Sequence, residues 1–574
     1  MIELILKQGG ESEPPFSKKM VKWCIACSKD GRFTGVIPLG EGKGRLFDKC
    51  PELAFTELIG GKEPRCHFLV ESVATIALLM KDNEEEKIRE KNIAKHAFYC
   101  AMLGQAAEHA SYFSPVARML CDDDRLEEIR GELKKQKAKP GDTAVVIVED
   151  INPLEREEWH DWWRAFRTSL RSDKKTKGKM LSIVDGEWIN PAATFPKVKG
   201  LAAVGGLPTG DVPVGFDKDA FCSYGLEQST NAAMSEETAK AYVEALNDLI
   251  RKKSKRLGDA LCVYWYSGKI LDEEDLLALF YEPPEQASAA AELKAHELLD
   301  AIRSGRRPDL AGSTYNALLL SGASGRLMMR EFMQGSFETL VKSVEGWFSD
   351  LECVSRDGKG LARLPKFMAV VGSLVRELKD MPPPWLQRLW RSAITGIQIP
   401  DFILAQSVIR CRIDVIKDNP ANHARMGLMK AYHIRKGDKS MKPYLNPDHP
   451  HPAYHCGRLL ALYARLQHSA LGDVGAGVVQ RYYTAASQTP GLILGRLAAN
   501  SKNHLGKLKG GLAYWYEDEI AKIWGRIKDT IPRTLTLEEQ SLFALGYYQQ
   551  LASRKDSSED NNEKQNDMSK EENV

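Results

Sequence analysis

Hydrophobic positions follow two different patterns along the chain. Over residues 1–275, short apolar runs alternate with stretches that repeat apolar residues every three or four positions, as strands and amphipathic helices do. Residues 145–148 are typical of a buried strand, and residues 180–184 lead into Asp185-Gly186, which indicates a strand that enters a turn or hairpin. Between them, the tryptophans of segment 157–170 fall on one helical face.

The clearest helix of this first part spans residues 236–250. Ser235 is a suitable N-cap for it, and Glu236 and Glu237 suit the positive end of the helix dipole. Valine and aromatic residues at 261–266 then predict a β-strand. Helices and strands that alternate in this way predict a mixed α/β region.

Strand signals fade after residue 275, and the proline pairs near 283 and 383 are candidate boundaries. From 385 to 552 the chain consists of consecutive amphipathic segments, and residues 536–539 form a capping box that opens the last of them. The tail has almost no apolar residues, which predicts disorder. We therefore predict an α+β fold with four parts: an α/β head (1–275), a mostly helical middle (276–384), a helical bundle (385–555) and a disordered tail (556–574).

Composition narrows the class of protein but not its function. At 574 residues the chain is too long for one core. Its net charge of +2 shows no global attraction to nucleic acid, so any such affinity must come from local patches. The N-terminus turns polar too soon for a signal peptide, and no stretch approaches the ~20 apolar residues that span a bilayer. Eleven scattered cysteines suit a reducing cytoplasm.

Motifs for enzyme chemistry are weak. Cys24 and Cys27 have C-x-x-C spacing, but the spacing to other cysteines favours buried thiols over a metal site. The dipeptide His160-Asp161 is the core of one metal phosphohydrolase pattern, yet no further ligands are visible and packing in a helix is expected. Three histidines at 449, 451 and 455 favour a loop that enters a helix. No catalytic residue, metal or cofactor is predicted.

Clustered lysines and arginines are more informative, because such side chains neutralise phosphates and adjacent aromatic rings can stack on bases. The alternative for each cluster is a solvated surface in a nearly neutral protein. The clusters are Lys134, Lys135, Lys137 and Lys139; Lys174, Lys175, Lys177 and Lys179; Arg251, Lys252, Lys253, Lys255 and Arg256; and Arg303, Arg306 and Arg307.

Two loops could approach a ligand closely. The first, at residues 221–231, contains Ser223, Tyr224 and Gly225, followed by the amides of Gln228 and Asn231. Amides both donate and accept hydrogen bonds, as readout of base edges requires.

The second loop, at residues 318–330, is rich in small residues. Arg326 and Arg330 follow them four apart and would share a helix face on which both could grip phosphate. The alternative is a turn between two helices with ordinary surface arginines.

Several ordered blocks resemble the large subunit of the type I-C CRISPR Cascade complex, the Csd-type large subunit. Residues 196–200 (PKVKG) resemble "H-P-K-I-K-G", and residues 221–231 resemble "F-x-S-Y-G-x-x-Q-x-x-N-A-P". Gly325, Arg326, Leu327 and Arg330 resemble "N-x-x-R-L-S-V-R", and residues 454–459 (YHCGRL) resemble "A-Y-x-x-G-R-L". Ala233 replaces the expected proline, and Ser321-Gly322 replace the usual Pro-Asn, so both loops depart from the family pattern at these positions.

The resemblance implies a non-catalytic, cytoplasmic subunit of an RNA-guided antiviral DNA surveillance complex. Such a subunit recognises the protospacer-adjacent motif, helps to open the duplex, holds the displaced strand and helps to recruit a helicase-nuclease. Its partners would be the backbone, handle-capping and small Cascade subunits, the CRISPR guide RNA, target double-stranded DNA and its displaced strand. The family also implies an internal translation start for a separate small subunit, for which Met426, Met429 and Met441 are candidates.

On this basis we assign motif recognition to Ser223, Tyr224, Gly225, Gln228 and Asn231. Phosphate contact is assigned to Lys174, Lys175, Arg251, Lys252, Lys253, Lys255, Arg256, Arg326 and Arg330. Arg458 is a further candidate for phosphate contact, or alternatively a brace within the bundle. Two other functions are kept open: an assembly scaffold that binds guide RNA only, and a metal-dependent nuclease that uses His160-Asp161.

Overall fold

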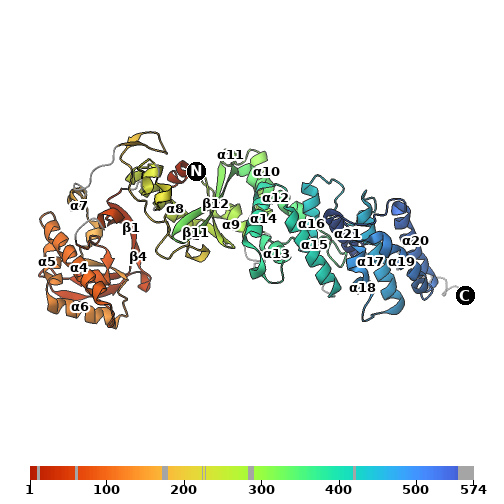
Figure 1. Cartoon of the computed structure of the whole chain (residues 1–574), viewed down its shortest axis with the longest axis horizontal. Coiled ribbons are helices and arrows are strands. Elements are labelled where there is room, and N and C mark those ends of the chain that lie inside the picture. The colour runs from red at the N-terminus through yellow and green to blue at the C-terminus, as the bar shows by residue number, and fades with distance from the viewer. Residues whose placement is uncertain are drawn as a thin grey trace. The chain divides into compact units, whose positions relative to one another are not determined.

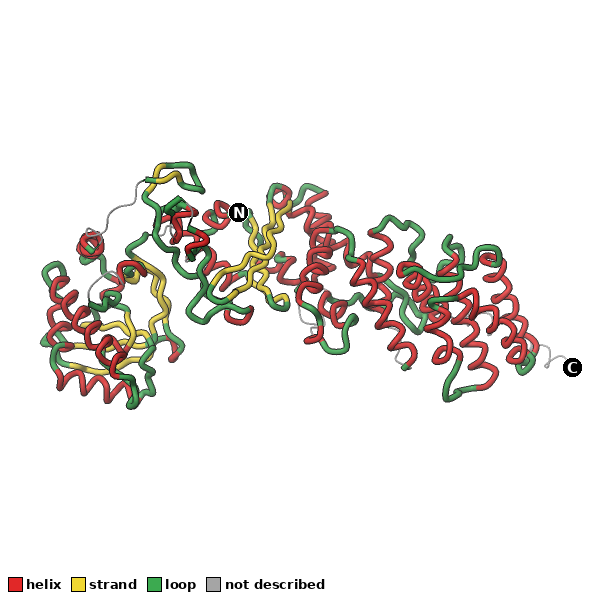
Figure 2. Tube along the Cα trace, viewed as in Figure 1, coloured by secondary structure: helices red, strands yellow, loops and turns green. Residues whose placement is uncertain are grey.

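Strands are concentrated in the first part of the chain and helices in the second (Figure 2). The structure is a computed structural model that describes residues 1–9, 13–58, 63–170, 179–216, 218–222, 224–226, 228–281, 290–417 and 422–553. The chain forms two compact units. The first contains Met1–Lys253 and Leu320–Met329, and the second contains Ser254–Leu319 and the chain from Arg330 onward. The α+β class is confirmed, and the four predicted ranges stay a prediction.

A four-stranded sheet organises the first unit. Its central strand β2 runs parallel to β6 and antiparallel to β3. The predicted buried strand at 145–148 is confirmed as part of β6, whose residues are almost all buried because it lies inside the sheet. In order across the sheet the strands are β3 (Phe33–Pro38), β2 (Trp23–Cys27), β6 (Thr143–Val148) and β5 (Glu71–Ser72).

Helices cover this sheet because β2 and β6 are parallel, and parallel neighbours need a long crossover connection. The crossover includes α4 (Glu86–Ala106), α5 (Phe113–Leu120) and α6 (Asp123–Lys135), which Figure 1 labels, with the short α2 (Phe55–Leu58) and α3 (Val73–Ile76) before them. Of these, α3, α5 and α6 pack on the strands of the sheet, and α4 packs on α3 and α5. A second, two-stranded sheet pairs β1 (Phe16–Val21) with β4 (Arg45–Pro51).

The tryptophan-rich helix is confirmed as α7 (His160–Ser169). Trp159 and Trp163 are fully buried and pack their rings against Phe68. The predicted hairpin is also confirmed as β7 (Met180–Leu181) and β8 (Trp188–Ile189). The aromatic stripe of this helix therefore belongs to the core of the first unit.

The predicted helix at 236–250 is confirmed as α8 (Glu236–Lys252). The Ser235 hydroxyl accepts from the backbone N–H of Thr238 at 3.0 Å, as expected for an N-cap. α8 packs against the N-terminal helix α1 (Ile2–Leu6). Its last residues, Arg251 and Lys252, are exposed, so the helix ends in positive charge that is open to solvent.

A second four-stranded sheet has the order β12-β11-β10-β9. The predicted strand at 261–266 is confirmed within it. The sheet also corrects the expectation that strands fade beyond residue 275, because its two long strands form a hairpin at 314–336. The strands are β9 (Ser254–Leu257), β10 (Ala260–Tyr266), β11 (Thr314–Ala323) and β12 (Arg326–Ser336).

The hairpin explains why the second loop was misread. Ser324 and Gly325 both have positive φ angles, 50° and 88°, as a two-residue turn of type I′ requires. The small residues that favoured a turn between helices are therefore the tip of a β-hairpin. Because Arg326 begins β12, the prediction that Arg326 and Arg330 share a helix face is wrong; they lie on one strand.

Helices form the rest of the second unit. The predicted run of helices from 385 to 552 is confirmed, and Thr536 caps the last of them through the predicted capping box. None of the helices in the described ranges is long and apolar enough to cross a membrane. The helices are α9 (Leu276–Phe280), α10 (Ala290–Arg303), α11 (Pro308–Ala311), α12 (Phe337–Leu351), α13 (Phe367–Gly372), α14 (Pro383–Thr395), α15 (Asp401–Ile416), α16 (His423–Arg435), α17 (Pro452–Leu471), α18 (Val478–Ala486), α19 (Pro490–Leu505), α20 (Gly510–Ile527) and α21 (Leu537–Ala552).

The helix α17 is central to the bundle and packs on α18, α19, α20 and α21. Two glycines allow α17 and α21 to approach each other closely. A Cβ atom on Gly457 would lie 1.9 Å from the carbonyl oxygen of Phe543, and one on Gly546 would lie 2.0 Å from that of Tyr454. Only glycine fits at this crossing.

Candidate nucleic-acid interface

An exposed loop of the first unit carries the residues that we predicted to read DNA. It runs from the 3-10 turn Asp219–Phe221 to the 3-10 turn Gln228–Ala232. Tyr224 is 99% exposed at its tip, and Tyr224 and Gly225 have φ angles of 57° and 69°. Two such residues in sequence bend the chain sharply, and the tyrosine ring is left in solvent. Ser223 lies outside the described residues.

Asn231 holds this loop together. Its Nδ2 donates to the carbonyl oxygens of Phe221 at 3.1 Å and Leu226 at 3.2 Å. An amide has two hydrogens to donate, so both are used within the loop, and among the described residues Oδ1 has no hydrogen-bond partner. Gln228 begins the second 3-10 turn, and its side chain lies outside the described part of the structure. Base recognition by these amides stays a prediction.

The tip of the β11–β12 hairpin belongs to the same unit and packs on the neighbouring segment. The N–H of Val212 donates to the carbonyl oxygen of Gly325 at 2.8 Å, and the N–H of Leu327 donates to that of Val212 at 3.0 Å. The guanidinium of Arg326 lies over the ring of Phe221, 5.7 Å from its centroid. The two predicted loops are therefore brought together, with Arg326 beside the loop that carries Tyr224.

Glycines make this contact possible. A Cβ atom on Gly322 would lie 2.1 Å from Cα of Gly206, so the backbone of the hairpin directly contacts the backbone of the segment before the loop. The buried Asp211 steadies that segment by accepting from the N–H of Leu207 at 3.2 Å. The departure at Ser321-Gly322 from the family pattern thus falls at a close backbone contact.

The basic cluster at 251–256 is divided between the two units. Arg251 and Lys252 end α8 and are exposed, while Lys253 is half-buried at the helix C-cap. Asp248 offsets part of this charge, because it accepts from Arg251 at 2.8 Å and from Lys18 at 3.1 Å. Exposed pairs of this kind are weak, so a phosphate could compete for Arg251.

Three other predicted phosphate ligands belong to the second unit. Lys255 and Arg256 lie on β9, where Arg256 Nε donates to the carbonyl oxygen of Gly258 at 3.0 Å. Arg330 lies on β12, 4.0 Å from Asp259, and both side chains are about half exposed. Lys174 and Lys175 lie outside the described residues.

An exposed aromatic residue of the first unit escaped the sequence analysis. Trp188 of the β7–β8 hairpin is 69% exposed, and Leu181 on the paired strand is also exposed. The Asp-Gly turn between two apolar runs was the available signal, but it predicts a hairpin and not the side of it that faces solvent. Stacking rings on an open surface are typical of single-strand binding proteins.

Arg458 is a buried brace, in line with one of the two roles that we predicted for it. Its side chain is only 4% exposed, and its Nε donates to Oε1 of Gln550 at 2.8 Å. Its Nη1 donates to Nδ1 of His455 at 3.1 Å, which fixes that imidazole as the neutral Nε2–H tautomer; the other ring nitrogen donates to the carbonyl oxygen of His449 at 2.7 Å. Burial lowers the pKa of Arg458 and lowers that of His455 to about 4.

The candidate enzyme residues do not form a site. His160 is buried, with its ring tilted against Phe16 and edge to face on Trp159, whereas Asp161 is 97% exposed and pairs with Arg164 at 2.6 Å. Within the described ranges, no three histidine, cysteine or acidic side chains are grouped as a metal site would need. These observations favour the packing role that we expected for His160 and give the nuclease hypothesis no support.

Cys24 and Cys27 are both buried on β2, as the alternative to a metal site predicted. Burial raises the pKa of each thiol to about 11. A thiol with so high a pKa carries little of the thiolate that binds metals.

Comparison with protein families decides the assignment. The family model described as CRISPR-associated protein (Cas_Csd1) matches residues 4–555. The chain belongs to the Csd1 family. This confirms the resemblance to the type I-C large subunit that the ordered motifs indicated. A search among curated proteins finds no significant match to this Csd1 chain.

Proposed function

We propose that this Csd1-family chain is the non-catalytic large subunit of an RNA-guided DNA surveillance complex. Its first unit reads the protospacer-adjacent motif, and its basic surfaces and helical bundle hold the displaced strand. Its partners are the other Cascade subunits, the guide RNA, the target DNA and a helicase-nuclease. The observation that carries this proposal is the meeting of the two predicted loops, which sets Arg326 on Phe221, a residue of the loop that carries the exposed Tyr224.

This geometry suits recognition of a short duplex motif. In RNA-guided systems base pairing reads the target, while protein reads only the flanking motif. A guanidinium that is held over an aromatic ring keeps a fixed direction, and arginine makes the commonest specific contact to guanine edges. A fully exposed tyrosine on a sharp bend is placed to stack or to enter a groove without disturbing the fold.

The positive charge is local, as a chain with a net charge of +2 requires. Arg251 and Lys252 are exposed at the end of α8, and Arg256 is exposed on β9. Each would neutralise phosphates without regard to base sequence. For the proposed separate small subunit, Met441 is the favoured start, because it lies between α16 and α17, whereas Met426 and Met429 lie within α16 and a start at either would cut that helix.

The first test compares the reconstituted guide complex with and without this chain. Gel shifts at a fixed salt concentration would use targets that carry either the permissive flanking motif or a scrambled one. Motif-dependent binding should require the chain. If the complex without it selects motifs equally well, the chain is an assembly scaffold that binds guide RNA only.

Variants then locate the reading surface. Arg326→Gln and Tyr224→Ala should each reduce the preference for the permissive motif, whereas Arg89→Gln, which removes an exposed arginine from α4, should leave it unchanged. Gln228→Ala tests whether the amide of Gln228, whose side chain lies outside the described residues, contributes to the motif preference. Asn231→Ala must be accompanied by hydrogen exchange of the loop, because loss of its two internal hydrogen bonds would loosen the loop itself. Full discrimination by a folded Arg326→Gln, Tyr224→Ala complex would contradict the assignment.

A further inference from the structure

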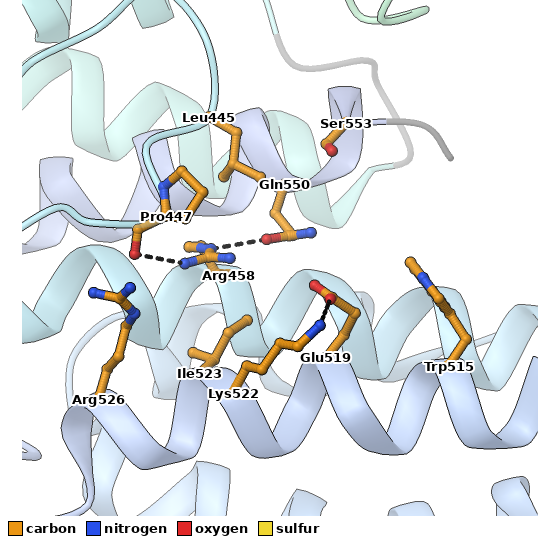
Figure 3. A pocket seen from close by; sticks show the side chains of 10 residues that line it. All are labelled: Leu445, Pro447, Arg458, Trp515, Glu519, Lys522, Ile523, Arg526, Gln550 and Ser553. Carbon is orange, nitrogen blue, oxygen red and sulfur yellow. Dashed lines mark hydrogen bonds and ion pairs between the residues drawn. The ribbon is translucent and has the colours of Figure 1, made fainter. Parts of the chain in front are cut away.

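A pocket of about 530 Å³ opens in the bundle between α17, α20 and α21 (Figure 3). Its volume lies within the range of about 300–1,000 Å³ that is common for small-ligand sites. Arginine, lysine, glutamine and tryptophan side chains line it, together with one glutamate. Arg458 is the only predicted interface residue among those that line it. The hydrogen bonds that make Arg458 a brace use only two of its three guanidinium nitrogens.

Two buried side chains aim hydrogen-bond donors into this pocket. Arg458 uses Nε and Nη1 for protein partners, and among the described residues its Nη2 has none. Gln550 is 3% exposed, and its Oε1 must face Arg458 because it accepts from Nε there. Its Nε2 therefore points the other way, as Figure 3 shows, and has no partner in the described parts of the chain. Neither donor atom is among the buried side-chain atoms of the described chain that lack a partner, so both are open to the pocket and can donate to a ligand with acceptor oxygens.

Lys522 and Arg526, at the rim of the pocket, add positive charge that an anionic ligand could bind. Lys522 pairs with Glu519 at 3.0 Å and with Asp518 at 2.6 Å, and Arg526 pairs with Asp448. These rim pairs are largely open to solvent, and such pairs contribute only about 0–1 kcal/mol each. A phosphate that also meets the buried Arg458 can therefore displace them.

The two ends of the pocket differ in chemistry. Figure 3 shows Arg526 at one end, Arg458 and Lys522 in the middle, and Trp515 at the other end. The indole of Trp515 is partly buried and packs edge to face on Tyr516, with ring centroids 4.9 Å apart. One end thus suits an anion and the other a flat ring.

We propose that this pocket holds one nucleotide of a single strand, with its phosphate at Arg458, Lys522 and Arg526 and its base against Trp515. The inference rests on the proposed function, which supplies the single strand as a ligand. The arrangement matches the general chemistry of single-strand binding, in which basic side chains follow the backbone and an aromatic ring stacks on a base whatever its sequence. An acidic peptide would use the cations but would leave the indole unused.

Photo-crosslinking of the full chain tests this site directly. The probe is a short single-stranded DNA that carries 5-iododeoxyuridine, and the crosslinked peptide is identified by mass spectrometry. The expected product contains Trp515. Trp515→Ala should weaken binding of the same probe about tenfold, the loss typical of one stacked base.

Charge is tested with matched double variants. Lys522→Gln with Arg526→Gln removes two rim cations, while Lys502→Gln with Lys528→Gln removes two exposed lysines from the same bundle outside the pocket. Only the first pair should abolish the crosslink at Trp515. For single strands each phosphate contact contributes about 0.7 to the salt slope. Because the three cations hold one phosphate, the parent chain should lose up to about 2.6-fold more affinity than the first variant between about 50 and 200 mM salt. Circular dichroism confirms that both variants are folded.

Crosslinks that map elsewhere, or that survive in the first variant as in the second, would overturn the proposal. A matched RNA probe separates the two sources of the strand: a stronger RNA crosslink at Trp515 would assign the pocket to guide RNA and a stronger DNA crosslink to the displaced strand. The experiment does not depend on motif discrimination. A complex that fails to select motifs but still crosslinks at Trp515 would refute the proposed function alone, and a complex that selects motifs without this crosslink would refute the pocket alone.

Discussion

Replacement of Gly546 by alanine should force apart the two helices that hold the pocket arginine. The added Cβ would lie 2.0 Å from the carbonyl oxygen of Tyr454 on α17. Such contacts are essentially never closer than about 3.0 Å, so α17 and α21 must separate by about 1 Å. A shift of that size is enough to break the 2.8 Å hydrogen bond from Arg458 to Gln550.

The change in the free energy of local opening of α17 and α21 is the sum of two opposing effects. Insertion of a methyl group into a packed core costs about 3 kcal/mol when the neighbours are backbone atoms that cannot turn aside. Alanine in place of glycine within a helix gains about 1 kcal/mol. The net loss of about 2 kcal/mol corresponds to a roughly 30-fold increase in the equilibrium constant for local opening.

Hydrogen exchange measured by mass spectrometry is the appropriate assay, because a chain with two compact units need not unfold in a single transition. Peptides from α17 and α21 should exchange roughly 30-fold faster in the Gly546→Ala variant. The crosslink at Trp515 should weaken as the Arg458–Gln550 pair opens. Peptides from the first unit should be unaffected.

Gly525→Ala is the matched control, since its Cβ would meet no atom within 4 Å. It lies in α20, beside the same pocket, and should slow exchange of that helix about fivefold through helix propensity alone. The prediction is contradicted if α17 and α21 exchange no faster in Gly546→Ala than in the parent chain. It is also contradicted if Gly525→Ala speeds exchange as much as Gly546→Ala does.

Three further outcomes are expected. Arg251→Gln with Lys252→Gln should lower the slope of log affinity against log salt by up to about 1.8 in gel shifts with duplex DNA, since each phosphate contact contributes about 0.9. Tyr224→Ala should leave the calorimetric melting temperature unchanged, because the ring is 99% exposed, while motif preference falls. Acidification from about pH 6.5 to 4 should destabilise the bundle in calorimetry: burial lowers the pKa of His449 and His455 to about 4, against about 6.5 when unfolded.

The sign of the pH effect follows from proton uptake. Between these two pKa values the unfolded chain binds protons that the folded chain excludes, so stability from the neutral histidines is complete above about pH 6.5 and is lost as the pH falls. A melting temperature that stays constant over this window would contradict the assignment. An unchanged salt slope would make the α8 cluster an ordinary solvated surface, and a lower melting temperature for Tyr224→Ala would mean that its ring supports the fold.

Local signals in the sequence were sufficient for many elements. Helix α8 has its cap at Ser235 and helix α21 at Thr536, as predicted, because a cap involves residues only two or three positions apart. The buried strand β6 and the β7–β8 hairpin were also predicted from short patterns. Family membership could be inferred for the same reason: short motifs survive in order along the chain.

What the sequence could not determine are contacts between distant positions. The small residues before Arg326 suit either a helical turn or a hairpin, and pairing with β10 makes β11 a strand. Asn231 was expected to face DNA, and only the folded loop shows its amide bonded to Phe221 and Leu226. The pocket depends on Arg458 meeting Gln550, 92 positions away. Periodicity and capping depend only on residues within one short segment, so the sequence predicts them. Which hydrogen-bond donors point into a pocket depends on which distant segments pack together, so only the tertiary structure shows it.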